Sequence, residues 1–171
     1  MNLMQLDISK KTAYLGLFTV LAMAFSYLET IIPLNFGLPG IKLGLSNTVI
    51  LSVLFLFSIK EAMLINIARI ILAGFLFGNM YGILYSLAGG IVSLLIMWLV
   101  KKIKSFSIYG ISIAGGVSHN IAQLFVAACV INNLKISMYG PVLIISGFIT
   151  GIIVAYIAKF ILKAVETYVR L

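Results

Sequence analysis

Apolar residues fall into six long blocks along the chain, and short polar segments separate one block from the next. A helix needs about 20 residues to cross about 30 Å of hydrocarbon, so this pattern predicts six transmembrane helices. The second and third blocks are short, and we expect these two helices to be tilted or to have their ends covered by loops. The blocks run approximately over residues 12–33, 43–59, 62–78, 80–100, 108–131 and 140–162.

Composition identifies the solvent of this chain. Of the 171 residues, 63% are hydrophobic and 9% are charged. A soluble domain of this size could not cover so much apolar surface with so few charges, so lipid must be the main solvent. We expect residues 1–171 to form one all-α integral membrane domain. The first block is too long for a cleavable signal peptide and lacks a small-residue cleavage site.

The net charge is +8, and the basic residues stand in small groups between the apolar blocks. A nucleic-acid-binding protein would gather them on one face, so the pattern instead indicates topogenic charges or contacts with anionic membrane lipid. With the N-terminus inside, the outer segments carry two basic residues, Lys42 and Lys135, and the cytoplasmic segments carry nine. The positive-inside rule therefore predicts an N-in, C-in topology. The nine are Lys10, Lys11, Lys60, Lys101, Lys102, Lys104, Lys159, Lys163 and Arg170.

The longest irregular outer segment is residues 33–42, PLNFGLPGIK. Its two prolines and two glycines stop helix and favour turns. Two interpretations stay open: a lid that folds back over the helices, or a plain connector. The lid interpretation makes Lys42 a candidate binding residue.

Arg69 lies near the middle of the third apolar block. A guanidinium in hydrocarbon costs at least ~2.5–3.5 kcal/mol, so this charge must have a partner or a function. Asn66 lies three residues earlier and shares its helix face. Arg69 either pairs with Glu29 on a neighbouring helix or offers its bidentate guanidinium to an anionic or carbonyl-bearing ligand.

The fifth block carries a second polar group, His119, Asn120 and Gln123. At about 1.5 Å per residue these side chains fall near the middle of the membrane, close to the depth of Arg69, while Glu29 and Asn47 lie nearer the outer face. We expect all of them to line one cavity that opens outward. Two alternatives are that the amides hydrogen-bond neighbouring helices and that His119 is an interior histidine with satisfied hydrogen bonds.

The sequence lacks the residues that several kinds of catalytic or binding site require. There is no P-loop motif, the one aspartate is Asp7, and the three glutamates are dispersed. The single histidine has no carboxylate near it in sequence, and the single cysteine, Cys129, cannot form an internal disulfide. We therefore expect neither an enzyme nor a metal or cofactor site.

Four stretches resemble a known family. They are YLE at 27–29, PGIKLGLSN at 39–47, NIARI and LFGN within 66–79, and GGVSHNIAQL at 115–124. Together they resemble the Gx transporter family, also labelled heptaprenyl diphosphate synthase component I, over nearly the whole chain. The segment from Lys42 to Asn47 is also similar to the start of the second helix in S components of energy-coupling-factor (ECF) transporters, with asparagine in place of aspartate at 47.

The resemblance implies a six-helix, ECF S-component-like bundle that binds a small vitamin-like solute from outside, with residues 33–42 as the lid. It also implies that a small-residue face on the first helix, here Ala22 and Ser26, docks onto a membrane-embedded T subunit that two ATPases drive. The solute would be vitamin-like or related to quinones, isoprenoids or flavins. Two other functions remain open: a membrane component of quinone- or flavin-linked extracellular electron transfer, and an accessory subunit of heptaprenyl diphosphate synthesis.

Overall fold

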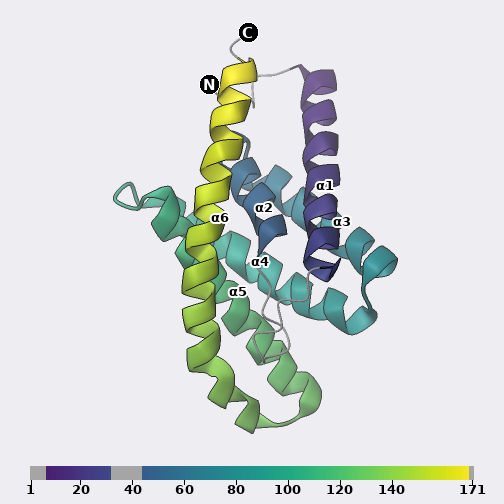
Figure 1. Ribbon diagram of the computed structural model, residues 1–171, viewed down its shortest axis with the longest axis vertical. Coiled ribbons are helices and arrows are strands. Elements are labelled where there is room, and N and C mark those ends of the chain that lie inside the picture. Colours follow the sequence, from purple (N-terminus) through teal and green to yellow (C-terminus); the bar gives the residue numbers. More distant parts are fainter. Residues whose placement is uncertain (1–6, 32–43, 170–171) are drawn as a thin grey trace.

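A computed structural model describes residues 7–31 and 44–169, so the predicted lid and Lys42 lie outside the described residues. The described chain consists of six α-helices and one short 3-10 helix, η2 (Figure 1). The helices are α1 (Ile8–Ile31), α2 (Leu45–Leu56), α3 (Ile59–Phe77), α4 (Met80–Lys102), α5 (Ile108–Ile131), η2 (Leu134–Tyr139) and α6 (Gly140–Val169).

The polar residues between the apolar blocks begin the helices. Ser58 forms a capping box with Glu61, whose carboxylate accepts from the backbone N–H of Ser58 at 3.2 Å. Asn79 accepts from the backbone N–H of Gly82 at 2.8 Å at the start of α4, and Ser107 caps α5 in the same way. These caps satisfy N–H groups that a helix leaves without partners in its first turn, which explains why the chain breaks at these residues.

α2 is the shortest α-helix and the most deeply buried one. Its 12 residues span about 18 Å, which is less than the hydrocarbon thickness. α2 contacts α1, α3, α4 and α6, and Figure 1 shows it between α1 and α6. The other helices therefore shield α2 from lipid on most sides, so a short helix here leaves little backbone exposed to hydrocarbon.

Among the described residues, four helical segments are long and apolar enough to cross a membrane: α1, α4, α5, and the segment Leu134–Thr167, which comprises η2 and most of α6. Many large apolar side chains on these helices are exposed, as expected for surfaces that face lipid. The all-helical membrane fold is therefore confirmed, while the count of six spans stays a prediction. The two α-helices outside these four segments are α2, which is short, and α3, which carries Lys60, Glu61 and Arg69.

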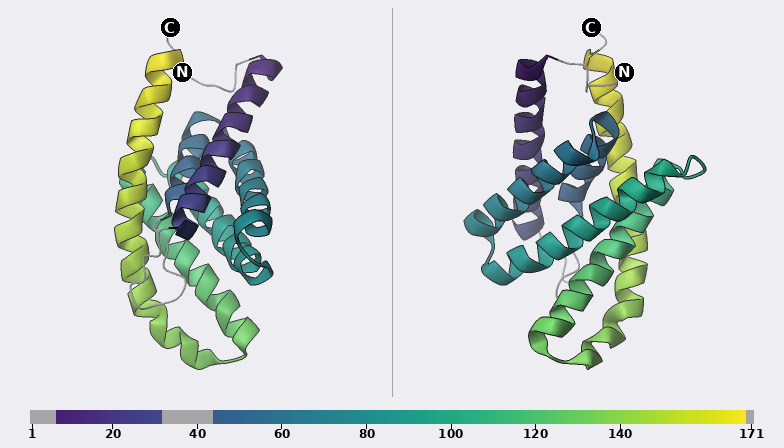
Figure 2. Two further views of the ribbon diagram at one scale, coloured as in Figure 1. Left: turned by 45° about the vertical axis from the view of Figure 1, so that its right-hand side comes forward. Right: turned by 180° about the vertical axis from the view of Figure 1, so that it is seen from behind.

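α5 and α6 form a hairpin that extends past the ends of α1 and α3 (Figure 2). Glycines bring the two backbones together, because a Cβ added at Gly147 would lie 2.7 Å from the carbonyl oxygen of Gly116. A Cβ at Gly151 would lie 2.6 Å from the Cα of Ile113. Gly147 and Gly151 form a G-x-x-x-G pattern, which favours close helix packing in membranes.

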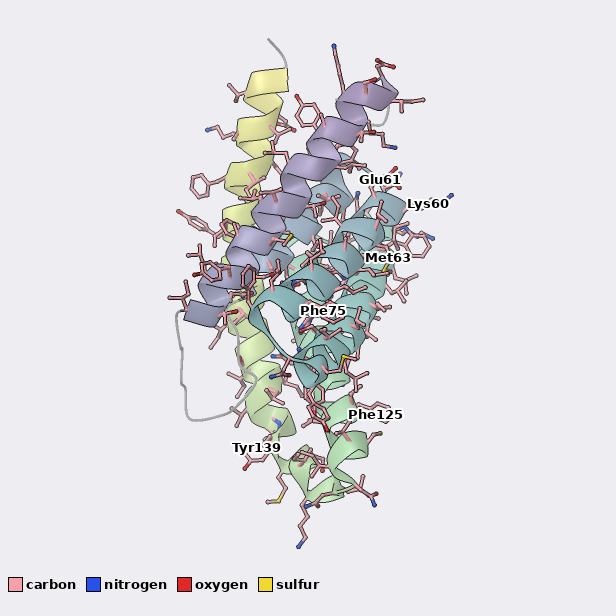
Figure 3. The ribbon with its side chains drawn as sticks, turned by 90° about the vertical axis from the view of Figure 1, so that its right-hand side faces the viewer. Lys60, Glu61, Met63, Phe75, Phe125 and Tyr139 are labelled. Atoms are coloured by element: carbon pink, nitrogen blue, oxygen red, sulfur yellow. The ribbon has the colours of Figure 1, made fainter. Side chains whose placement is uncertain are left out.

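The start of α1 and the end of α6 lie at the same end of the molecule (Figure 1). At this end Lys11 on α1 forms an ion pair of 2.5 Å with Glu61 on α3. Figure 3 shows Lys60 and Glu61 at this end and Tyr139 at the other. The arrangement agrees with an N-in, C-in chain, and the assignment of this end to the cytoplasm stays a prediction.

Candidate binding cavity

Arg69 is buried on α3, with 6% of its surface exposed, and it binds three polar side chains. Its Nε and Nη2 atoms donate to Asn66 Oδ1 at 3.1 and 2.8 Å. Nη2 also donates to Asn47 Oδ1 at 2.9 Å, and Nη1 donates to Ser46 Oγ at 2.6 Å. Arg69 thus ties α3 to the first turn of α2, where Ser46 and Asn47 lie.

Glu29 on α1 completes this network from the other side. Its Oε1 accepts from the backbone N–H of Leu45 at 2.7 Å, and its Oε2 accepts from Ser46 Oγ at 3.1 Å. The carboxylate therefore caps the N-terminus of α2 from a neighbouring helix, where the helix dipole favours negative charge. This cap replaces one from Gly44, which has no side chain and a left-handed backbone with φ of 74°.

Of the two sequence-based interpretations of Arg69, the ion pair with Glu29 needs correction, and ligand binding stays a prediction. Arg69 and Glu29 make no direct ion pair in the described structure; Ser46 bridges them by accepting from Arg69 and donating to Glu29. Arg69 and Glu29 bond the same Ser46 hydroxyl, so their opposite charges lie close together. Each charge therefore lowers the energetic cost of burying the other. The protein engages most of the guanidinium donors, so only part of the group remains for a ligand.

Two kinds of donor remain for a guest molecule. A guanidinium has five N–H groups, and the four hydrogen bonds leave one N–H on Nη1 without an acceptor among the described residues. Asn47 uses its oxygen on Arg69, which orients its amide and leaves the Nδ2 donors for other contacts. Arg69 and Asn47 both line a cavity, so the donors suit a ligand with acceptor oxygens.

The cavity has a volume of about 120 Å³ and lies between α1, α2, α3, α4, α5 and α6. One water needs roughly 10–15 Å³ on this kind of measure, so the space can hold a small organic solute. Exposed residues at one end, including Thr30 and Asn79, also line it, which places its mouth near the turn between α3 and α4. Its polar and charged lining includes Glu29, Ser46, Asn47, Arg69, Ser93, Ser112, His119, Asn120 and Gln123.

α5 contributes one continuous face to this cavity. The lining positions are spaced three and four residues apart, as a single helix face requires. Gly89 on α4 makes room for the two largest side chains, since an added Cβ would lie 2.8 Å from His119 Nε2 and 2.9 Å from Gln123 Cγ. The α5 residues that line the cavity are Ser112, Gly115, Gly116, His119, Asn120 and Gln123.

Comparison with known protein families identifies the family of this chain. The family model described as heptaprenyl diphosphate synthase component I matches residues 18–161, most of the chain. The chain belongs to this family. No curated protein matches the chain, and no solved structure matches it. The membrane family predicted from the four sequence stretches is thereby confirmed.

In this family member the structure brings Glu29, Asn47, Arg69, His119, Asn120 and Gln123 to one cavity. Asn120 has a further role, because its Nδ2 donates to the backbone oxygen of Leu143 on α6 at 2.8 Å. That bond is the interhelical contact considered as an alternative for the amides. The prediction that these side chains bind a solute stays a prediction.

Three sequence-based candidates have other positions. Asn66 is buried behind Arg69 and supports the guanidinium, and it does not line the cavity. Ala22 is fully buried within the chain, and Ser26 lines the cavity while its hydroxyl donates to the backbone oxygen of Ala22. Ala22 therefore lies on the inward side of α1 and Ser26 is partly buried, and docking of a T subunit through this pair stays a prediction.

Several lining residues of this family member were not among the sequence-based candidates. Ser46 carries the bridge between Glu29 and Arg69; it lies within the 42–47 segment that is similar to S components, but no local pattern indicates the bridge. Ser93 and Ser112 lie deep in the cavity and are 3% and 2% exposed. The glycine pair Gly89-Gly90 was a usable signal, because paired glycines in a membrane helix mark close approach of a neighbour.

Proposed function

We propose that this chain is the substrate-binding subunit of an ECF-type importer in the cell membrane, and that a small solute binds in the cavity. The observation that carries the proposal is a cavity of about 120 Å³ around the donors of Arg69 and Asn47. Intramembrane ionisable residues that face a cavity commonly mark a substrate path. The family match and the long apolar helices support the membrane location that this function requires.

The solute class follows from the lining. Arg69 and Asn47 offer N–H donors, so the solute carries acceptor oxygens such as a carbonyl or a carboxylate. Ile70, Ala73, Phe77 and Val154 supply apolar walls for the body of the molecule. A solute of this kind fits the general pattern of pockets that are largely apolar with a few placed polar groups.

Energy for import would come from outside this chain. In the proposal a membrane-embedded T subunit and two ATPase subunits drive the movement. The role proposed for this chain is recognition of the solute, followed by reorientation within the assembly.

A thermal-stability screen with a blocked variant tests solute binding. Ala73→Phe on α3 places a ring in the cavity, whereas Leu72→Phe changes the adjacent residue, which is 44% exposed. A solute at 100 times its Kd stabilises the folded protein by about 2.7 kcal/mol. We expect wild type and Leu72→Phe to be stabilised by the same compound, and Ala73→Phe to show no shift. Equal stabilisation of all three would place binding outside the cavity.

The description of the family favours a second candidate, an accessory subunit in heptaprenyl diphosphate synthesis. A reconstitution assay separates the two candidates. If the chain is accessory to synthesis, a soluble prenyl-elongating subunit makes long-chain product only when this chain is present. If the chain is a solute-binding subunit, the rate of product formation is the same with and without it.

A further inference from the structure

The cavity extends past the Arg69 network in the direction away from its mouth. Along α5 its lining runs from Gln123 near the mouth to Ser112, eleven residues earlier. At about 1.5 Å per residue this stretch is about 16 Å long. A cavity of about 120 Å³ over that length is narrow and elongated.

The deep end of this cavity is polar. Ser112 is 2% exposed, and its Oγ has no hydrogen-bond partner among the described residues. A serine in a helix usually bonds its own backbone, as Ser52 does with Thr48 O at 2.9 Å, so a buried hydroxyl without this bond is unusual. Leaving such a group unsatisfied costs about 1–3 kcal/mol.

Ser93 on α4 adds a second hydroxyl at this depth. It is 3% exposed and lines the same cavity. A Cβ added at Gly115 would lie 2.6 Å from Met97 Sδ and 3.2 Å from Ser93 Oγ, and Gly115 follows Ser112 by one turn of α5. Gly115 therefore leaves the space that lets Met97 and Ser93 approach α5 near Ser112.

We propose that Ser112 and Ser93 form a second polar subsite at the deep end of the cavity, which takes a hydroxyl or carbonyl group of the solute. The inference deepens the proposed function and rests on it. A solute that fills both subsites is elongated, with acceptor oxygens at the Arg69 end. Its second polar group reaches Ser112, about 10 Å along α5 from the level of His119.

Cysteine reactivity tests this subsite without knowledge of the solute. All variants carry Cys129→Ser, so that the introduced thiol is the only one in the chain. The probe is 2-hydroxyethyl methanethiosulfonate, which forms a mixed disulfide with the thiolate and releases methanesulfinate. Intact-mass spectrometry in membrane vesicles measures the rate for Ser112→Cys, for Gln123→Cys near the mouth, and for Ser52→Cys. Ser52 is fully buried on α2 and does not line the cavity.

We expect Ser112→Cys and Gln123→Cys to react at least about tenfold faster than Ser52→Cys, because access decides the rate of a buried thiol. Reaction at Gln123→Cys with none at Ser112→Cys would overturn the deep subsite and leave the outer cavity intact. Slow reaction at all three sites would contradict the cavity and the proposed function together. Equal reaction at Ser112→Cys and Ser52→Cys would also overturn the subsite, because the probe would then not need the cavity.

A second probe tests the polarity of the deep end. Propyl methanethiosulfonate matches the first probe in size and lacks the hydroxyl. With both rates normalised to free cysteine, we expect Ser112→Cys to prefer the hydroxyethyl probe, because the Ser93 hydroxyl can hydrogen-bond it. A severalfold preference for the propyl probe would show an apolar deep end and would overturn the proposal.

Discussion

At the residue scale, the central problem of this chain is a guanidinium buried among membrane helices. Arg69 solves it with acceptors from two helices and with the nearby charge of Glu29, to which Ser46 connects it. The network fixes the planar group and orients Asn47 at the edge of the cavity. The polar centre of the molecule is therefore prearranged, which lowers the ordering cost of binding a guest.

Replacement of Arg69 by lysine tests whether the planar geometry matters. Lysine keeps the charge, but its ammonium cannot bridge Ser46, Asn47 and Asn66 as the guanidinium does. For a compound that stabilises the wild type in the thermal screen, we expect Arg69→Lys to weaken affinity about tenfold or more, equal to ~1.4 kcal/mol. Isothermal titration in detergent measures this change. An unchanged affinity would remove Arg69 from the binding site.

At the element scale, buried helices depend on contacts that their neighbours supply. α2 receives Glu29 at its N-terminus and Lys101 at its C-terminus, where Lys101 Nζ donates to Leu54 O at 2.7 Å. An anion at the first turn and a cation at the last turn both interact favourably with the helix dipole and stabilise the helix. The α5–α6 hairpin depends instead on Gly116, Gly147 and Gly151, whose missing side chains allow backbone contact.

Gly147→Ala tests the close approach of α5 and α6. The new methyl group would lie 2.7 Å from the carbonyl oxygen of Gly116, so the helices must separate. We expect a loss of about 1–3 kcal/mol in the free energy of unfolding, the usual cost of overpacking. Gly16→Ala on α1 is the matched control, because nothing lies within 4 Å of an added Cβ there.

The control should be neutral or slightly stabilising, since alanine favours helix over glycine by about 1 kcal/mol. Unfolding in a denaturing detergent, followed by circular dichroism, measures both variants. A Gly147→Ala protein as stable as Gly16→Ala would show that the α5–α6 contact is looser than the structure has it.

At the scale of the whole molecule, the sequence predicted elements better than contacts. The apolar block 108–131 coincides with α5, because Ser107 and Asn132 flank it with clear helix ends. α2 is shorter than the block 43–59 because the chain turns at Gly44 and again at Ser58. Apolar runs predict where a helix lies, but the polar and glycine residues between these runs decide where it ends.

The contacts of the cavity were harder to predict. Helix spacing paired Arg69 with Asn66, yet the bonds to Ser46 and Asn47 cross between helices and leave no local pattern. The inward position of Ala22 was also hidden, because α1 is apolar on all sides and its faces cannot be told apart by hydrophobicity. The sequence therefore identified most of the polar lining but not which helix faces meet.

Native mass spectrometry of the gently purified protein tests most directly whether the cavity holds a solute. We expect wild type and Leu72→Phe to retain one small molecule at a one-to-one ratio, and Ala73→Phe to retain none. That molecule should carry acceptor oxygens at one end and a second polar group at the other. Retention of lipid alone, in equal amounts in all three forms, would show that the cavity is not a solute-binding site.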